Sequence, residues 1–190
     1  TRFTAVQRAV HHQVEEYVHH MRQRLLRRID HEPILDRLRT LWEADFQPTA
    51  AQIRTADPDL GIPSDAKWED IMGVLPDVLH DVQVNTINGT AKDALDYADS
   101  QETGLKVTVI GGDKLARGFT LEGLCVSYFL RASRMYDTLM QMGRWFGYRP
   151  GYLDLCRLYT TPELLEWFGH ITDAAEELRE EFDLMAASGS

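Results

Sequence analysis

The chain has 190 residues, an apolar fraction of 44% and a formal net charge of −10 at pH 7. This length suffices for one α/β domain with a hydrophobic core, or for such a domain with a helical annex. It contains no uninterrupted run of about 18 apolar residues, which excludes a membrane-spanning helix, and no signal peptide precedes the first helical pattern. We therefore expect a cytoplasmic protein. The only two cysteines, Cys125 and Cys156, lack metal-ligand spacing and are expected to be buried free thiols.

The charge is unevenly distributed along the chain. Residues 105–160 hold eight basic and four acidic side chains, while the rest of the chain is strongly acidic. The basic part is also rich in glycine. This distribution favours a focused anion-binding site over a broad nucleic-acid face.

The first part of the chain is predicted to be helical. Apolar residues recur at helical spacing over residues 3–28 and again over residues 33–45. Residues 47–63 contain three prolines and a glycine and are predicted to be a connector. Ser64 and Asp65 are expected to cap a further helix, which Pro76 should end or kink.

After residue 80 the pattern changes to strands that alternate with helices. Strands are predicted at residues 82–87, 105–110, 125–130 and 153–159, with helices near 91–98, 136–146 and 161–185. Thr161 should cap the last helix, with Pro162 in its first position. Alternating strands and helices predict an α/β fold with a mostly parallel sheet covered on both faces. The strongly acidic last helix is interpreted either as a solvated face or as a docking helix for a partner.

The first candidate functional segment is GGDKLARGFTL, at residues 111–121, directly after a predicted strand. Ligands of parallel sheets bind beyond the carboxyl ends of the strands, and glycines there permit close approach of the backbone. Lys114 and Arg117 add positive charge. A strand-to-helix turn with two solvated cations explains the same residues.

The second segment is QMGRWFGYRPGY, at residues 141–152. It places Arg144 and Arg149 on either side of an aromatic turn with glycines. Arginine meets phosphate as a planar fork and can stabilise charge that develops during phosphoryl transfer. The alternative is that the aromatic residues belong to the core and the arginines stack on them.

The two segments together are more specific than either alone. Residues 113–120 resemble the fifth motif of superfamily-two helicases, and residues 141–149 resemble the sixth, the arginine-finger motif. Longer phrases, at residues 111–124, 127–131 and 135–149, resemble the Z-one domain family. That family occurs in endonucleases and in NTPase subunits of restriction and defence systems, and the resemblance extends over essentially the whole chain.

The resemblance implies that the fold is RecA-like, the second of two such domains in a helicase-type motor. Arg144 and Arg149 would be the catalytic fingers that reach NTP held by the first motor domain. The nucleotide-binding residues implied are Gly112, Asp113, Arg117, Gly118, Thr120, Gln141 and Gly143, and Lys114 and Arg117 would contact nucleic acid.

The sequence also departs from the helicase pattern. The finger arginines are spaced more widely than usual, and Gln141 stands two rather than three residues before Gly143. Thr120 stands where many relatives have an aspartate. The sequence therefore does not decide which arginine contacts the γ-phosphate.

The resemblance predicts three parts: a helical segment at residues 1–63, a RecA-like core at 64–160 and an acidic helix and tail at 161–190. A phosphate-binding loop and a magnesium-binding carboxylate pair are absent from this sequence, and the histidines of residues 11–20 are interpreted as a solvated helix face rather than a metal site. We therefore expect ATP or another NTP, with Mg²⁺, to be held by a first RecA-like motor domain upstream in the same protein.

The expected function is that of the second motor half-domain of a DNA-dependent NTPase in a restriction or defence endonuclease. Its partners would be the first motor domain, double-stranded DNA and a nuclease subunit or domain, and no membrane. The isolated half should not hydrolyse NTP. The alternative is a RecA-like partner-binding or regulatory module without motor activity.

Overall fold

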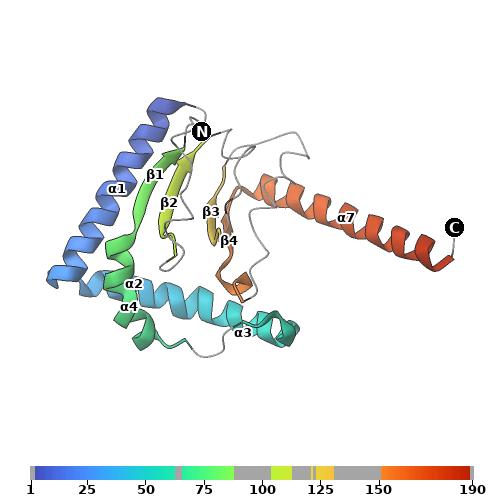
Figure 1. The fold of residues 1–190 in the computed structure, drawn as a ribbon, viewed down its shortest axis with the longest axis horizontal. Coiled ribbons are helices and arrows are strands. Elements are labelled where there is room, and N and C mark those ends of the chain that lie inside the picture. Colours follow the sequence, from blue (N-terminus) through green and yellow to red (C-terminus); the bar gives the residue numbers. More distant parts are fainter. Residues whose placement is uncertain are drawn as a thin grey trace. The chain divides into compact units, whose positions relative to one another are not determined.

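The computed structural model describes residues 3–62, 66–87, 104–112, 121, 123–130 and 151–188 (Figure 1). These residues belong to two units. The first contains α1 to α4, strands β1 and β2, and the short helix η4; the second contains strands β3 and β4 and helix α7. Among the helices that the structure describes, none is long and apolar enough to cross a membrane. The predicted three-part division of the chain stays a prediction.

Helix α1 (Thr4–Arg27) confirms the first predicted helix, and its predicted apolar face is covered in its second half but not in its first. Val14 is half-buried and Leu25 is buried, whereas Val6 and Tyr17 are exposed. Near the start of α1 the buried residue is Gln7, and the helix packs against β1, β2 and α4. Figure 1 shows α1 lying alongside β1.

The next segment is continuously helical and corrects the predicted connector. Helix α2 (Glu32–Leu41) passes into a wide π-helical turn, η1 (Trp42–Phe46), and then into α3 (Gln47–Ala56). Pro48 was taken as a helix breaker, and that prediction was wrong. A proline ring collides with the carbonyl group four residues earlier, and here that residue lies within the wide turn, which makes room for it.

Helix α4 (Trp68–Asp81) follows the 3₁₀ turn η2 (Pro58–Leu60). Its N-cap is Lys67, not the predicted Ser64 or Asp65, and the backbone N–H of Lys67 donates to the carboxylate of Asp70 at 3.2 Å. Pro76 lies inside the helix and does not end it. The chain therefore passes from α4 directly into β1.

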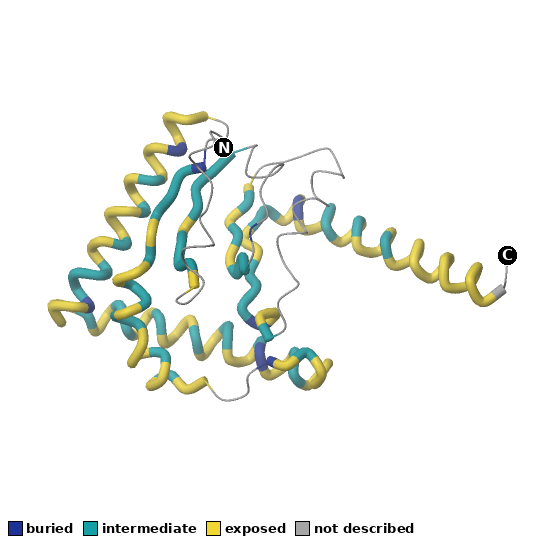
Figure 2. The backbone as a smooth tube through the Cα atoms, viewed as in Figure 1, coloured by how far each residue is buried: buried dark blue, intermediate teal, exposed yellow. Residues whose placement is uncertain are grey.

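Strands β1 (Gln83–Ile87) and β2 (Val107–Gly111) form a parallel pair. Their register runs from Gln83 opposite Val107 to Ile87 opposite Gly111. Ile87 is 1% exposed and anchors the core of the first unit. The first strand was predicted from its alternation and the second from its run of β-branched residues, and Figure 2 shows both half-buried along most of their length.

In the second unit, β3 (Val126–Tyr128) pairs in parallel with β4 (Arg157–Tyr159). The predicted strand over residues 153–159 is thus only half strand, because η4 (Leu153–Leu155) occupies its start. In the first unit, η4 packs against α3, and Gly151 donates to the carbonyl oxygen of Leu60 at 3.1 Å.

Helix α7 (Pro162–Ser188) confirms the predicted acidic last helix and its cap. The backbone N–H of Leu164 donates to the hydroxyl oxygen of Thr161 at 3.3 Å, and Leu164 is 1% exposed. Beyond Ala175, the described side chains of α7 are all exposed (Figure 2). The acidic residues there are exposed, and the choice between a solvated face and a docking helix stays a prediction.

The prediction of a RecA-like, mostly parallel sheet with helices on both faces was wrong. The described residues are mainly helical, and their strands form two separate two-stranded pairs. The prediction was correct only in that both pairs are parallel. Strands at the centre of a doubly covered sheet are buried on both faces, whereas in β3 both Val126 and Tyr128 are exposed.

Replacing Ile87 with alanine should destabilise the protein by about 2–4 kcal/mol, because a fully buried isoleucine leaves a cavity. The measurement is the free energy of unfolding in urea, followed by circular dichroism. Ile29→Ala is the matched control, since Ile29 is 56% exposed and its truncation should cost less than about 0.5 kcal/mol. Equal losses in the two variants would contradict the assignment of Ile87 to the core.

Candidate functional site

The carboxyl end of the β1–β2 pair contains the only predicted site residue among those described. Gly111 is the last paired residue of β2 and lies opposite Ile87. Gly112 follows it and is half-buried. The prediction that a strand leads directly into these glycines is confirmed. The parallel register brings the ends of both strands to one edge, which is where ligands of parallel sheets bind.

The remaining predicted site residues lie outside the described part of the chain. They are Asp113, Lys114, Arg117, Gly118, Thr120, Gln141, Gly143, Arg144 and Arg149. Their roles therefore stay predictions.

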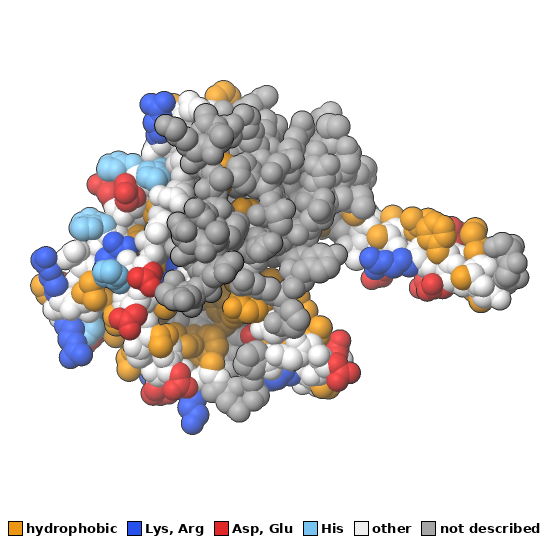
Figure 3. All heavy atoms as spheres, in the orientation of Figure 1, with side chains coloured by type: hydrophobic (Ala, Val, Ile, Leu, Met, Phe, Trp, Pro, Cys, Tyr) orange, Lys and Arg blue, Asp and Glu red, His pale blue; other side chains and the backbone are white. Residues whose placement is uncertain are grey.

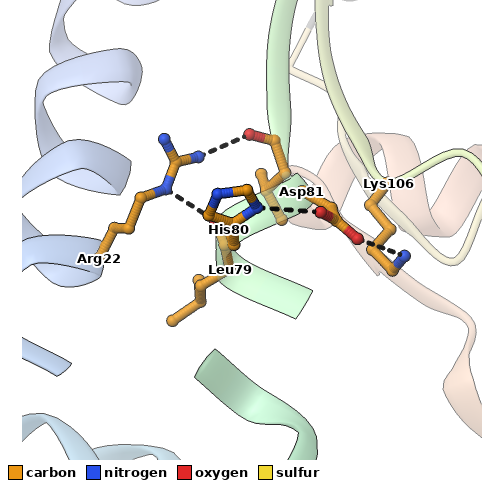
Figure 4. Close-up of polar contacts among 6 residues, drawn as sticks. Arg22, Leu79, His80, Asp81 and Lys106 are labelled. Atoms are coloured by element: carbon orange, nitrogen blue, oxygen red, sulfur yellow. Dashed lines mark hydrogen bonds and ion pairs between the residues drawn. The ribbon is translucent and has the colours of Figure 1, made fainter. Parts of the chain in front are cut away.

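The opposite, amino-terminal end of the same strand pair carries a polar cluster around Arg22 (Figure 4). Arg22 projects from α1 toward the junction of α4 and β1. Its Nε donates to the carbonyl oxygen of Leu79 at 2.8 Å, and its Nη2 donates to that of Val82 at 2.9 Å. The last carbonyls of a helix lack intrahelical partners and carry partial negative charge, so a guanidinium is well suited to this position.

Asp81 connects α4 to β2 within this cluster. Its carboxylate accepts from the ammonium of Lys106 at 3.1 Å and lies 3.2 Å from Nδ1 of His80. These contacts, with His80 first and Lys106 second, hold the pKa of Asp81 below its ordinary value of 3.8. Lys106 also makes a backbone hydrogen bond where the strand pair begins, since its carbonyl oxygen accepts from the N–H of Gln83 at 2.9 Å.

An open depression of about 520 Å³ lies at this end. It is lined by Arg22, His80, Asp81, Val82, Gln83, Gly104, Leu105 and Lys106. Its guanidinium and ammonium groups already bind backbone carbonyls and a carboxylate of the chain itself. The cluster is therefore best explained as a structural junction, and the opposite edge at Gly112 is the better candidate for a ligand.

Sequence reasoning missed this junction. Arg22 is one of four arginines at the end of the first helix, and cations in general suit the dipole at a helix C-terminus. Nothing in the spacing of the residues distinguishes it from Arg24, whose guanidinium contacts the carbonyl of Asp30. The only available signal was that Asp81 precedes one predicted strand and Lys106 lies at the start of the next.

The histidines at the start of α1 lie close to carboxylates of the same helix. His11 and His12 lie close to Glu15 and Glu16, one turn further along the same helix, at 3.7 and 3.5 Å. Nδ1 of His11 also lies 3.0 Å from the hydroxyl of Thr86 in β1. Within the described ranges, no group of three or more His, Cys, Asp or Glu residues is arranged to hold a metal ion.

Charged side chains on the visible face of the described helices alternate in sign (Figure 3). Arg39 on α2, for example, binds Glu43 at 2.7 Å. This face therefore offers no broad basic patch among the residues that the structure describes.

Comparison with known families accounts for the whole chain. The model of the Z1 (Z-one) domain matches residues 1–190. The chain belongs to the Z1 domain family. No curated protein and no solved structure matches it. The family part of the sequence resemblance is thus confirmed, while the helicase-like part of it stays a prediction for this Z1 domain.

Arg22→Ala should destabilise the Z1 domain by about 2–4 kcal/mol, because two carbonyls at the α4–β1 junction lose a charged donor. Arg22→Lys should recover only part of this, since lysine cannot present a fork. Urea unfolding measures both changes. Arg8→Ala is the control, because it removes the same charge from an exposed position on α1. Equal free energies of unfolding for Arg22→Ala and Arg8→Ala would contradict this role of Arg22.

Asp81→Asn should lower the melting temperature at neutral pH but not in acid. The folded state holds the pKa of Asp81 below its unfolded value. The stabilisation is therefore present above the unfolded pKa and is lost as the pH falls through the folded one. Melting curves of wild type and variant should converge below about pH 4. Asp77→Asn, at an exposed position on the same helix, should show no such convergence; a pH-independent gap for Asp81→Asn would contradict this explanation.

Proposed function

We propose that this Z1 domain supplies arginine side chains to an NTP bound by another domain, within a DNA-dependent NTPase that drives a restriction or defence endonuclease. The observation that carries the proposal is the Gly111–Gly112 pair at the shared carboxyl end of β1 and β2. The cationic, motif-bearing segment begins immediately after it.

Chain connectivity supports a cationic site at this edge. Lys114 follows Gly112 by two residues, so its Cα atom stays within about 7 Å of that of Gly112, and Arg117 within about 18 Å. Glycine without a Cβ lets a phosphate approach the backbone closely. A glycine pair at a strand end that is followed in the sequence by two cations is suited to an anionic ligand.

The proposal does not require a RecA-like sheet. An arginine that acts on a nucleotide held elsewhere needs a supporting edge and a complementary partner surface, and function belongs to such sites rather than to a fold class. The nucleotide, ATP or another NTP with its Mg²⁺, would be bound by the first motor domain. Double-stranded DNA and a nuclease subunit or domain would be the further partners.

The acidic composition limits the role in DNA binding. With a net charge of −10, and charges of both signs interspersed on the visible described face (Figure 3), this domain should contribute only a small, salt-sensitive share of DNA affinity. Lys114 and Arg117 would supply that share. DNA affinity would come mainly from other parts of the assembly.

In the full-length protein, Arg144→Ala and Arg149→Ala should each lower the rate of NTP hydrolysis by on the order of a thousandfold. Nucleotide affinity should change far less, because an arginine aimed at developing charge acts mainly in the transition state. Lysine at either position should rescue poorly, since it lacks the planar fork. Steady-state hydrolysis and equilibrium nucleotide binding separate the two effects.

Arg134→Ala is the control for this experiment, because Arg134 lies in the same cationic stretch but outside the QMGRWFGYR motif. It should retain turnover close to wild type. If both finger variants also retained it while folding normally, the arginines would be structural. A partner-binding or regulatory module without motor activity would then be the better function.

A further inference from the structure

The two cysteines of the chain lie beside each other, each directly before one of the two paired strands of the second unit. The register pairs Val126 of β3 with Arg157 of β4, so that Cys125 and Cys156 each stand one residue before this pair. The backbone N–H of Arg157 donates to the carbonyl oxygen of Cys125 at 2.8 Å. Although 31 positions separate them in the sequence, the two residues are direct cross-strand neighbours.

This placement satisfies the geometry of a disulfide. Adjacent strands lie about 4.8 Å apart, and the Cα atoms of bridged cysteines are usually about 4.4–6.8 Å apart. Successive side chains along a strand alternate between faces, so two residues at the same register position point to the same face. Neither cysteine is in a disulfide in this structure.

The surroundings leave the pair accessible to a small reagent. Both cysteines are half-buried rather than fully enclosed, which differs from the buried thiols that the sequence suggested. The thiol of Cys125 donates to the carbonyl oxygen of Gly123 at 3.3 Å. The guanidinium of Arg157 reaches the carbonyl oxygen of Cys156 at 2.9 Å, which places a positive charge next to the pair. A neighbouring cation stabilises the negative charge that sulfur carries during thiol–disulfide exchange.

We propose that Cys125 and Cys156 form a dithiol site that small disulfides of the glutathione class oxidise to an intrachain disulfide between β3 and β4. One cysteine thiolate attacks the small disulfide, forms a mixed disulfide and releases one small thiol. The second cysteine then attacks the protein sulfur of that mixed disulfide and releases the other small thiol. The two protein thiols lose two electrons and two protons, and the small disulfide is reduced to two thiols.

Oxidation would close a covalent loop around the segment that contains the predicted finger arginines. The residues between Cys125 and Cys156 include the whole motif at residues 141–149. In compartments that keep thiols reduced, a bridge of this kind is typical of redox-sensing proteins rather than of permanent structure. The proposal concerns the dithiol itself and does not depend on the proposed NTPase role.

The experiment incubates the purified chain with an excess of oxidised glutathione and measures the intact mass and the melting temperature. Wild type should lose two hydrogens in mass, yield a peptide that links Cys125 to Cys156, and melt roughly 5–15 °C higher. Dithiothreitol should reverse all three changes. Cys125→Ser and Cys156→Ser should each gain one glutathione instead, without a rise in melting temperature.

A double variant, Cys156→Ser with Leu158→Cys, is the matched control. It keeps two cysteines on the same face, but moves one by two residues, so that the Cα atoms are about 8 Å apart and cannot be bridged without backbone movement. It should accumulate glutathione rather than form a bridge. The proposal is overturned if wild type carries two glutathiones stably, forms only disulfide-linked dimers, or closes no faster than this control.

Discussion

The first unit depends on the contact between Arg22 and the end of α4. One guanidinium binds the carbonyls of Leu79 and Val82, one on each side of the point where the helix becomes β1. Because Arg22 belongs to α1, this contact also sets where α1 lies along the strand pair, and His11 meets Thr86 near the other end. Helices α1 and α4 and strand β1 are thus held together at one junction (Figure 4).

Elements with local signals were predictable, and contacts between distant residues were not. The β-branched run before Gly111 and the Thr161–Pro162 cap are properties of a few consecutive residues, and the structure confirms both. Pro48 was misjudged because the cost of a proline in a helix depends on what surrounds it. The prediction that the strands form one sheet was wrong for a similar reason. A run of strand-forming residues does not reveal how many partners each strand finds, and the described strands find one each.

The candidate site shows the same division. Glycine after a strand is a local pattern, and Gly112 lies where it was expected, at the carboxyl edge of a parallel pair. The roles of Arg22 and of the neighbouring cysteines were invisible in the sequence, because each depends on a residue 30 or more positions away. The sequence marks residue types suited to phosphate chemistry, whereas only the register shows which of them become neighbours.

The wide turn between α2 and α3 determines how the loss of one residue would affect this helical segment. In an uninterrupted α-helix, Leu38 and Ala50 would point about 120° apart, since each residue turns the helix by about 100°. The π turn, in which the N–H of Gln47 reaches back to the carbonyl of Trp42, absorbs one extra residue and realigns the covered side of α3 with that of α2. Removing any one residue between Trp42 and Phe46 would leave a regular helix whose two halves still point the same way. Deleting one residue in this turn should therefore keep the packing of Ala50, which is 6% exposed. Keeping all residues but forcing the turn into α geometry would instead rotate Ala50 out of its packing.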